Sequence, residues 1–158
     1  MVTAFLVSAA MLLLVAFICL PKRLHPREIA TVWTGFVFVL ITLLGMAGPK
    51  NGKFLSVQED LPTYVSIRIW EVLVIPLVLL LYLNRSQSLE RRGAKWLAAL
   101  FCLLVLYGCE LGIVCLKVMS YQRWQFWWSP FFWLVMLAFA VGLQKGMRSL
   151  LQKEVQQS

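Results

Sequence analysis

The chain has 158 residues, of which 61% are hydrophobic and 14% are charged, and its mean hydropathy is +0.79. An ordinary soluble domain has roughly 45–50% apolar and about 25% charged residues, so this composition excludes a soluble enzyme, a disulfide-stapled secreted domain and a disordered tail. The net charge of +8 comes from basic residues in short clusters between apolar runs, which is typical of membrane-protein loops and not of a nucleic-acid-binding surface.

Five apolar runs follow one another along the chain, and each is long enough to cross the ~30 Å hydrocarbon core as a helix. A transmembrane β-barrel requires alternation of period two, which these runs lack. We therefore predict an all-α, polytopic membrane protein with a single transmembrane domain over residues 1–158. The predicted spans of this five-helix bundle are about 2–20, 29–48, 64–84, 96–116 and 124–144, followed by a tail over 145–158.

The boundaries of these spans have local causes. Pro21 has no N–H to continue the first helix, and Pro26 suits the first turn of the second. Gly48 and Pro49 break the chain after the second span. Residues 1–21 contain no Lys or Arg, so the first span is expected to be a retained anchor and not a cleavable signal peptide.

The distribution of Lys and Arg predicts the orientation, because basic loops remain cytoplasmic. Ten basic residues fall on one side of the predicted bundle and four on the other. The protein is therefore expected to be a multi-pass protein of the cell membrane, with its N-terminus outside and its tail over 145–158 in the cytoplasm. The ten residues are Lys22, Arg23, Arg27, Arg85, Arg91, Arg92, Lys95, Lys145, Arg148 and Lys153; the four are Lys50, Lys53, Lys117 and Arg123.

Three charged residues lie inside the predicted spans, where charge is costly and usually faces the bundle interior. Arg68 and Glu71 are three residues apart and share one helix face, so they can pair. Glu110 of the fourth span falls at a similar depth. One Arg and two carboxyl groups leave an excess negative charge, so one carboxyl group is protonated or another cation is present. The cluster is either a structural ion pair with a neutral Glu nearby, or a proton relay or cation site.

Aromatic residues are dense at the start of the fifth span. Trp124, Trp127 and Trp128 are predicted to form an interfacial belt, because amphipathic rings favour the headgroup region. Pro130 follows and predicts a kink.

Other chemistry-bearing patterns are sparse. The four cysteines fall within spans and form no C-x-x-C, and His25 is the single histidine, so we predict no metal site. Nucleotide-binding, hydrolase and metalloprotease motifs are also missing from the sequence. We therefore predict no cofactor and assign no catalytic residues. The expected partners are the lipid bilayer and other membrane proteins or a second copy of this chain, but not nucleic acid.

A set of short motifs resembles a known family. The motifs are Pro26-Arg27-Glu28, Val74-Ile75-Pro76, Tyr82-Leu83-Asn84, Glu110, Tyr121-x-x-Trp124 and Ser129. They resemble a family of small, uncharacterised multi-spanning membrane proteins of spore-forming Bacillus and Clostridium relatives. The resemblance implies a bacterial integral membrane protein. Members carry an acidic residue late in the second span, whereas this sequence has Leu43, Leu44 and Gly45 there.

Two functions follow from these patterns. The first is a non-enzymatic integral membrane protein that acts through helix or lipid contacts in the cell envelope. The second is a small transporter or channel component that uses Glu71 and Glu110, with Arg68 as counter-ion.

Overall fold

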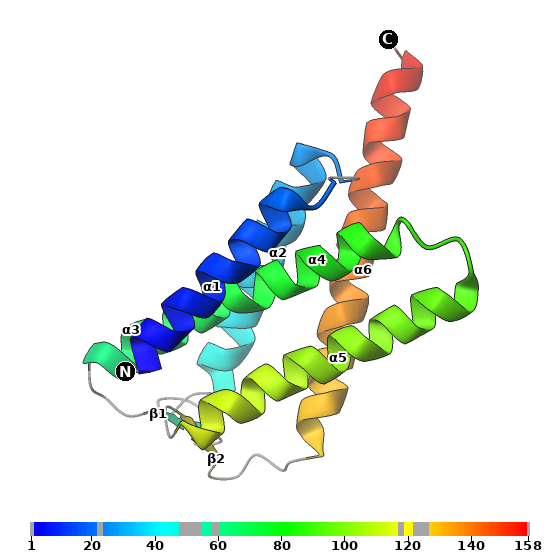
Figure 1. Ribbon diagram of the computed structural model, residues 1–158. Helices are drawn as coiled ribbons and strands as arrows, with labels where there is room; N and C mark the ends of the chain where they lie inside the picture. Colours follow the sequence, from blue (N-terminus) through cyan, green and yellow to red (C-terminus); the bar gives the residue numbers. More distant parts are fainter. Residues whose placement is uncertain are drawn as a thin grey trace.

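The computed structural model describes residues 2–21, 24–47, 55–57, 61–116, 119–121 and 127–157, and it confirms a helical fold (Figure 1). Within these ranges, four helical segments are long and apolar enough to cross a membrane: Pro26–Met46, Tyr64–Ser86, Arg92–Cys115 and Trp128–Lys153. The helices are α1 (Val2–Cys19), α2 (Pro26–Ala47), α3 (Leu61–Ile69), the π-helix η1 (Trp70–Val74), α4 (Ile75–Ser86), α5 (Arg92–Cys115) and α6 (Trp128–Gln157); the strands are β1 (Leu55–Val57) and β2 (Met119–Tyr121).

The segments α3, η1 and α4 form one continuous helix in the centre of the bundle. This helix contacts α1, α2, α5 and α6. The side chains of Ile75, Leu77 and Leu79 are buried although they point to different sides of α4. A helix that is apolar all round is buried when neighbours cover every face, and the third apolar run is the one that all the other helices contact.

The π-helix η1 is explained by Pro76. Proline has no N–H, and its ring collides with the carbonyl group four residues earlier, which here belongs to Val72. The helix widens just before Pro76, where the N–H of Ile75 donates to the carbonyl oxygen of Trp70, five residues back. This local widening leaves the helix continuous while it turns Trp70 and Glu71 into the bundle, where both side chains are buried.

Helices α2 and α6 pack along an extensive contact. Val32, Phe36 and Leu40 recur every four residues on α2 and are fully buried. Gly35 lies at the same contact, because a Cβ atom placed there would meet Leu143 Cδ1 of α6 at 3.0 Å. The missing side chain at this position leaves room for the side chain of Leu143; small residues are common where such helices pack closely.

The start of α2 is capped by His25 and Glu28. The N–H of Arg27 donates to His25 Nδ1 at 3.3 Å, and the N–H of His25 donates to Glu28 Oε2 at 3.4 Å. This arrangement is a capping box in which histidine replaces the usual serine or threonine. The Pro26-Arg27-Glu28 motif therefore has a structural role at a helix start.

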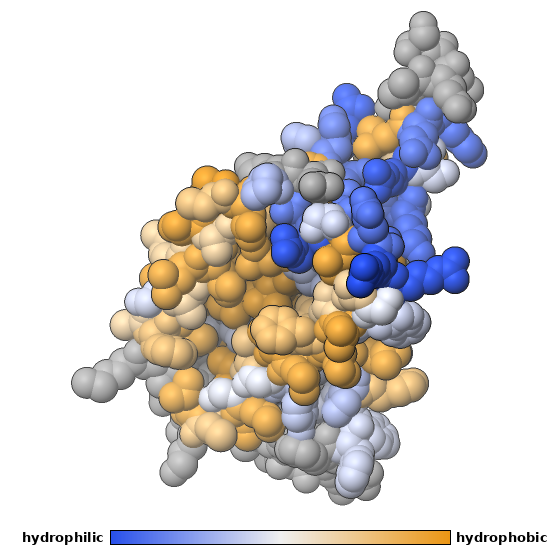
Figure 2. Space-filling view, turned by 45° about the vertical axis from the view of Figure 1, so that its right-hand side comes forward, coloured by the Kyte–Doolittle hydropathy of each residue, from blue (hydrophilic) through white to orange (hydrophobic). Residues whose placement is uncertain are grey.

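The two ends of the bundle differ in chemistry. At one end, Asn84 Nδ2 donates to the carbonyl oxygen of Pro21 at 3.1 Å, which ties the end of α4 to the connection between α1 and α2. At the other end, β1 pairs antiparallel with β2 in the register Leu55 to Tyr121. Figure 2 shows hydrophilic side chains gathered at the first end, over the α4–α5 connection and the C-terminal part of α6, beside a broad apolar surface.

The fifth predicted span differs from the observed helix. The α6 helix begins at Trp128, so Pro130 lies in its first turn, where an N–H has no intrahelical acceptor and proline is tolerated. The prediction of a kink at Pro130 inside the span was therefore wrong. At the other end, α6 continues to Gln157, so the residues of the predicted tail extend the same helix. The two three-residue strands were not predicted.

Candidate functional site

Glu110 lies in the buried stripe of α5. Cys102, Leu106, Glu110 and Ile113 recur at helical spacing, and all four side chains are buried. The stripe faces the core of the bundle. Glu110 is the one member of the stripe with a carboxyl group, and the other three are apolar. A buried carboxyl group is costly without hydrogen-bond partners, and these partners come from α6.

Two side chains of α6 donate to the two oxygens of Glu110. Ser129 Oγ donates to Oε1 at 2.7 Å, and Trp133 Nε1 donates to Oε2 at 2.5 Å. Ser129 and Trp133 are four residues apart on one face of α6 and are each 1% exposed. One donor on each oxygen suits a carboxyl group that acts as an acceptor. Glu110 therefore joins α5 to the first turns of α6.

Trp133 also joins this carboxyl group to the central helix. Its ring packs edge-on against Trp70, with centroids 6.1 Å apart and an interplanar angle of 87°. Trp70 is the first residue of η1 and the neighbour of Glu71. The indole of Trp133 therefore contacts both the carboxyl group of Glu110 on α5 and the ring of Trp70 in the π-helix.

Arg68 and Glu71 form the ion pair that their spacing predicts. Arg68 Nη1 lies 2.7 Å from Glu71 Oε2, and the side chains are 42% and 7% exposed. The guanidinium group also lies 5.1 Å from the centre of the Tyr64 ring, which is within the range of a cation–π contact. The pair thus has a buried carboxylate and a cation that reaches the surface.

The structure places the three predicted charges in two arrangements. Arg68 and Glu71 pair within one helix, and Glu110 is bound by α6 through Ser129 and Trp133. Ser129 was predicted only as part of a motif, and Trp133 was not predicted as a partner of Glu110. The signal that identifies them is their four-residue spacing, which places a hydroxyl group and an indole N–H on one helix face.

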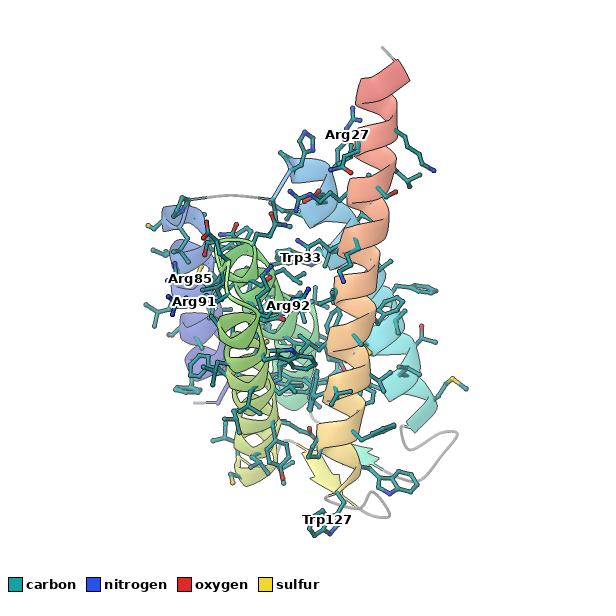
Figure 3. All side chains as sticks on the ribbon, turned by 90° about the vertical axis from the view of Figure 1, so that its right-hand side faces the viewer. Arg27, Trp33, Arg85, Arg91, Arg92 and Trp127 are labelled. Atoms are coloured by element: carbon teal, nitrogen blue, oxygen red, sulfur yellow. The ribbon has the colours of Figure 1, made fainter. Side chains whose placement is uncertain are left out.

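The predicted aromatic belt is only partly within the described residues. Trp127 and Trp128 are exposed, at 85% and 52%, whereas Trp124 lies outside the described residues. Figure 3 places Trp127 at the end of the molecule away from the labelled arginines Arg27, Arg85, Arg91 and Arg92. At the start of α5, Trp96 is exposed as well, so exposed tryptophans occur toward both ends of the apolar surface.

The site chemistry is that of buried hydrogen bonds and one ion pair. Among the residues that the structure describes, no group of three or more His, Cys, Asp or Glu side chains has metal-binding geometry.

No family model matches the chain, and no curated protein or solved structure matches it. The family resemblance of the short motifs therefore stays a prediction.

Proposed function

We propose that this chain is a multi-pass protein of the cell membrane that acts without enzymatic chemistry, through contacts with lipids or with other membrane helices. The observation that carries the proposal is the broad apolar surface of the outer helices (Figure 2). Large apolar side chains of all four outer helices are exposed, including Leu12 of α1, Phe38 of α2, Phe101 of α5 and Phe131 of α6. Lipid or another helix satisfies such a surface, whereas water does not.

The buried polar groups support a structural role. Both oxygens of Glu110 accept hydrogen bonds from protein side chains, and Glu71 pairs with Arg68. This arrangement favours a carboxyl group that holds helices together over one that exchanges with a substrate.

We further propose five spans, with α1 as the first, the N-terminus outside and the C-terminal part of α6 in the cytoplasm. Cytoplasmic ends carry an excess of Lys and Arg, and Arg27, Arg85, Arg91 and Arg92 lie away from Trp127 (Figure 3).

Cysteine labelling tests this orientation in a cysteine-free variant of the full chain. We expect Gly52→Cys to react with a membrane-impermeant maleimide on intact cells, and Ser88→Cys to react only after the membrane is opened. The reverse pattern would overturn the orientation, and reaction of both on intact cells would overturn the span count.

A transport function is the alternative, and the π-helix favours it. Single-turn π segments are frequent at functional sites, and η1 carries Glu71 beside an ion pair with a partly exposed Arg68. We propose the structural role first, because the ion pair already satisfies the buried carboxylate.

Proton flux separates the two functions. Purified protein is reconstituted into vesicles that contain a pH indicator, and a potassium diffusion potential is imposed. We expect proton entry no faster than in protein-free vesicles. Faster entry that is lost in Glu71→Gln but kept in Glu90→Gln, an exposed matched control, would overturn the proposal in favour of transport.

A further inference from the structure

A cavity of about 760 Å³ lies where α4, α5 and α6 meet at the basic end of the bundle. Among the residues that the structure describes, three cationic side chains line it, namely Lys95 of α5 and Lys145 and Arg148 of α6, and no acidic side chain does. We call this cavity the basic pocket. Three positive charges without a lining counter-charge favour an anionic occupant.

Uncharged polar groups complete the wall of the basic pocket. Gln144 is buried, and Gln87 and Tyr82 lie beside it in the lining. The Nε2 atom of Gln87 is buried and has no hydrogen-bond partner among the described residues. Because an unbonded buried amide is costly, an acceptor in the pocket would stabilise Gln87 after a rotation of its side chain. Amide donors together with Lys and Arg suit the oxygens of a phosphate group.

An apolar groove begins next to the basic pocket. It has a volume of about 370 Å³, lies between α1, α4 and α5, and is lined by Leu13, Val78, Phe101 and Val105 among others. Tyr82 lines both the groove and the basic pocket, and Arg85 lines the groove at the same end. From Arg85 to Val78 the groove follows α4 for roughly 10 Å at ~1.5 Å per residue, toward the middle of the bundle.

We propose that the basic pocket and the apolar groove together bind one anionic phospholipid of the inner leaflet. The phosphate contacts Lys95, Lys145 and Arg148, and an acyl chain lies in the groove past Tyr82. A water-soluble phosphate would leave the apolar groove empty. A zwitterionic lipid would bring the positive charge of its own headgroup toward the three cationic side chains. Basic pockets between helices at the cytoplasmic side of membrane proteins recognise anionic headgroups for the same reason. The inner-leaflet assignment rests on the proposed orientation.

Native mass spectrometry of the purified protein in detergent tests the headgroup. Phosphatidylglycerol and phosphatidylcholine with identical acyl chains are compared. We expect the parent protein to bind phosphatidylglycerol more tightly, and Lys145→Gln/Arg148→Gln to reduce that preference about tenfold or more. The matched control Arg92→Gln/Lys153→Gln removes the same charge from exposed positions outside the pocket. Equal binding of the two lipids by the parent, or an equal loss in the control, would overturn the proposal.

The groove is tested with a substitution that fills it. Ala98 lines the groove, whereas Leu104 is exposed on another face of α5. We expect Ala98→Trp to weaken binding of phosphatidylglycerol and Leu104→Trp to leave it unchanged, with all variants eluting like the parent in size exclusion. Ala98→Leu replaces Ala98→Trp where the latter elutes differently. Equal binding by the groove variant and its control would overturn the role of the groove.

Inorganic phosphate separates a lipid from a soluble anion. We expect phosphate at the concentration of the lipid to leave the lipid adduct unchanged, and displacement of the lipid would overturn the lipid assignment. The detergent assay does not depend on orientation. Lipid binding without preference, together with the predicted cysteine labelling, would therefore overturn this inference alone. Selective binding with reversed labelling would overturn the proposed orientation and the inner-leaflet assignment, and would leave the lipid-binding pocket and groove in place.

Discussion

The carboxyl group of Glu110 shows how one residue can hold two helices of the bundle together. Its position in an apolar stripe is unfavourable in isolation, and the donors that satisfy it lie 19 and 23 residues further along the chain. Each oxygen of Glu110 accepts one hydrogen bond, so two side chains of α6 hold the carboxyl group. Trp133 then extends the contact to Trp70 of the central helix. The stability of this region therefore depends on the hydrogen bonds that Glu110 accepts as well as on apolar burial.

We expect Glu110→Gln to preserve the folded protein and Glu110→Ala to destabilise it. The amide oxygen of glutamine can accept from Trp133, and the Ser129 hydroxyl can rotate to accept from the amide. Alanine removes the acceptor of two buried donors, and the loss of such a hydrogen bond costs about 1–3 kcal/mol. The measurement is the apparent melting temperature in detergent. A larger loss for Gln than for Ala would contradict the acceptor role of Glu110.

At the scale of elements, the central helix differs from the others in its neighbours. Helices α1, α2, α5 and α6 all contact it, so residues on every face of α4 are buried. Pro76 accounts for the π-helix η1 just before it, in which Trp70 and Glu71 are buried. Helix α2 packs extensively against α6. Its stripe of Val32, Phe36 and Leu40 is fully buried, and Gly35 leaves room for the side chain of Leu143.

We predict that Gly35→Leu lowers the apparent melting temperature more than Gly45→Leu does. A side chain at position 35 meets Leu143, whereas a Cβ atom at Gly45 meets nothing within 4 Å. Forcing extra atoms into a packed contact costs about 1–3 kcal/mol. Both glycines lie in α2, so the change in helix propensity is similar. Equal shifts for the two variants would show that the α2–α6 contact adapts without cost.

The whole molecule has one basic end and one end where two loops pair. Helix order alone places the β1 and β2 segments at the same end of an alternating bundle. The structure adds the register, in which Ser56 is opposite Ser120. This pairing connects the segments that follow α2 and α5, so it couples helices that are distant in the sequence.

The double variant Ser56→Cys/Ser120→Cys tests this pairing in the cysteine-free chain. Directly opposed strand residues have Cβ atoms about 4.5–5.5 Å apart, which approaches the range that a disulfide spans. We expect a disulfide after mild oxidation, detected by mass spectrometry of the unreduced digest. Ser56→Cys/Ser88→Cys is the control that remains unlinked. Failure to form the first disulfide, or equal formation of both, would contradict the register.

The sequence by itself determined the helical fold class and the approximate segments, because a run of ~20 apolar residues has the length and hydropathy of a membrane-crossing helix whatever its neighbours are. It also determined the Arg68–Glu71 pair, since both residues belong to one helix face. Only the tertiary structure decided that Ser129 and Trp133 bind Glu110, and that Tyr82 lines both the basic pocket and the apolar groove. The physical reason is that hydropathy is a property of one segment, whereas a partner on another helix depends on how the helices are rotated and packed.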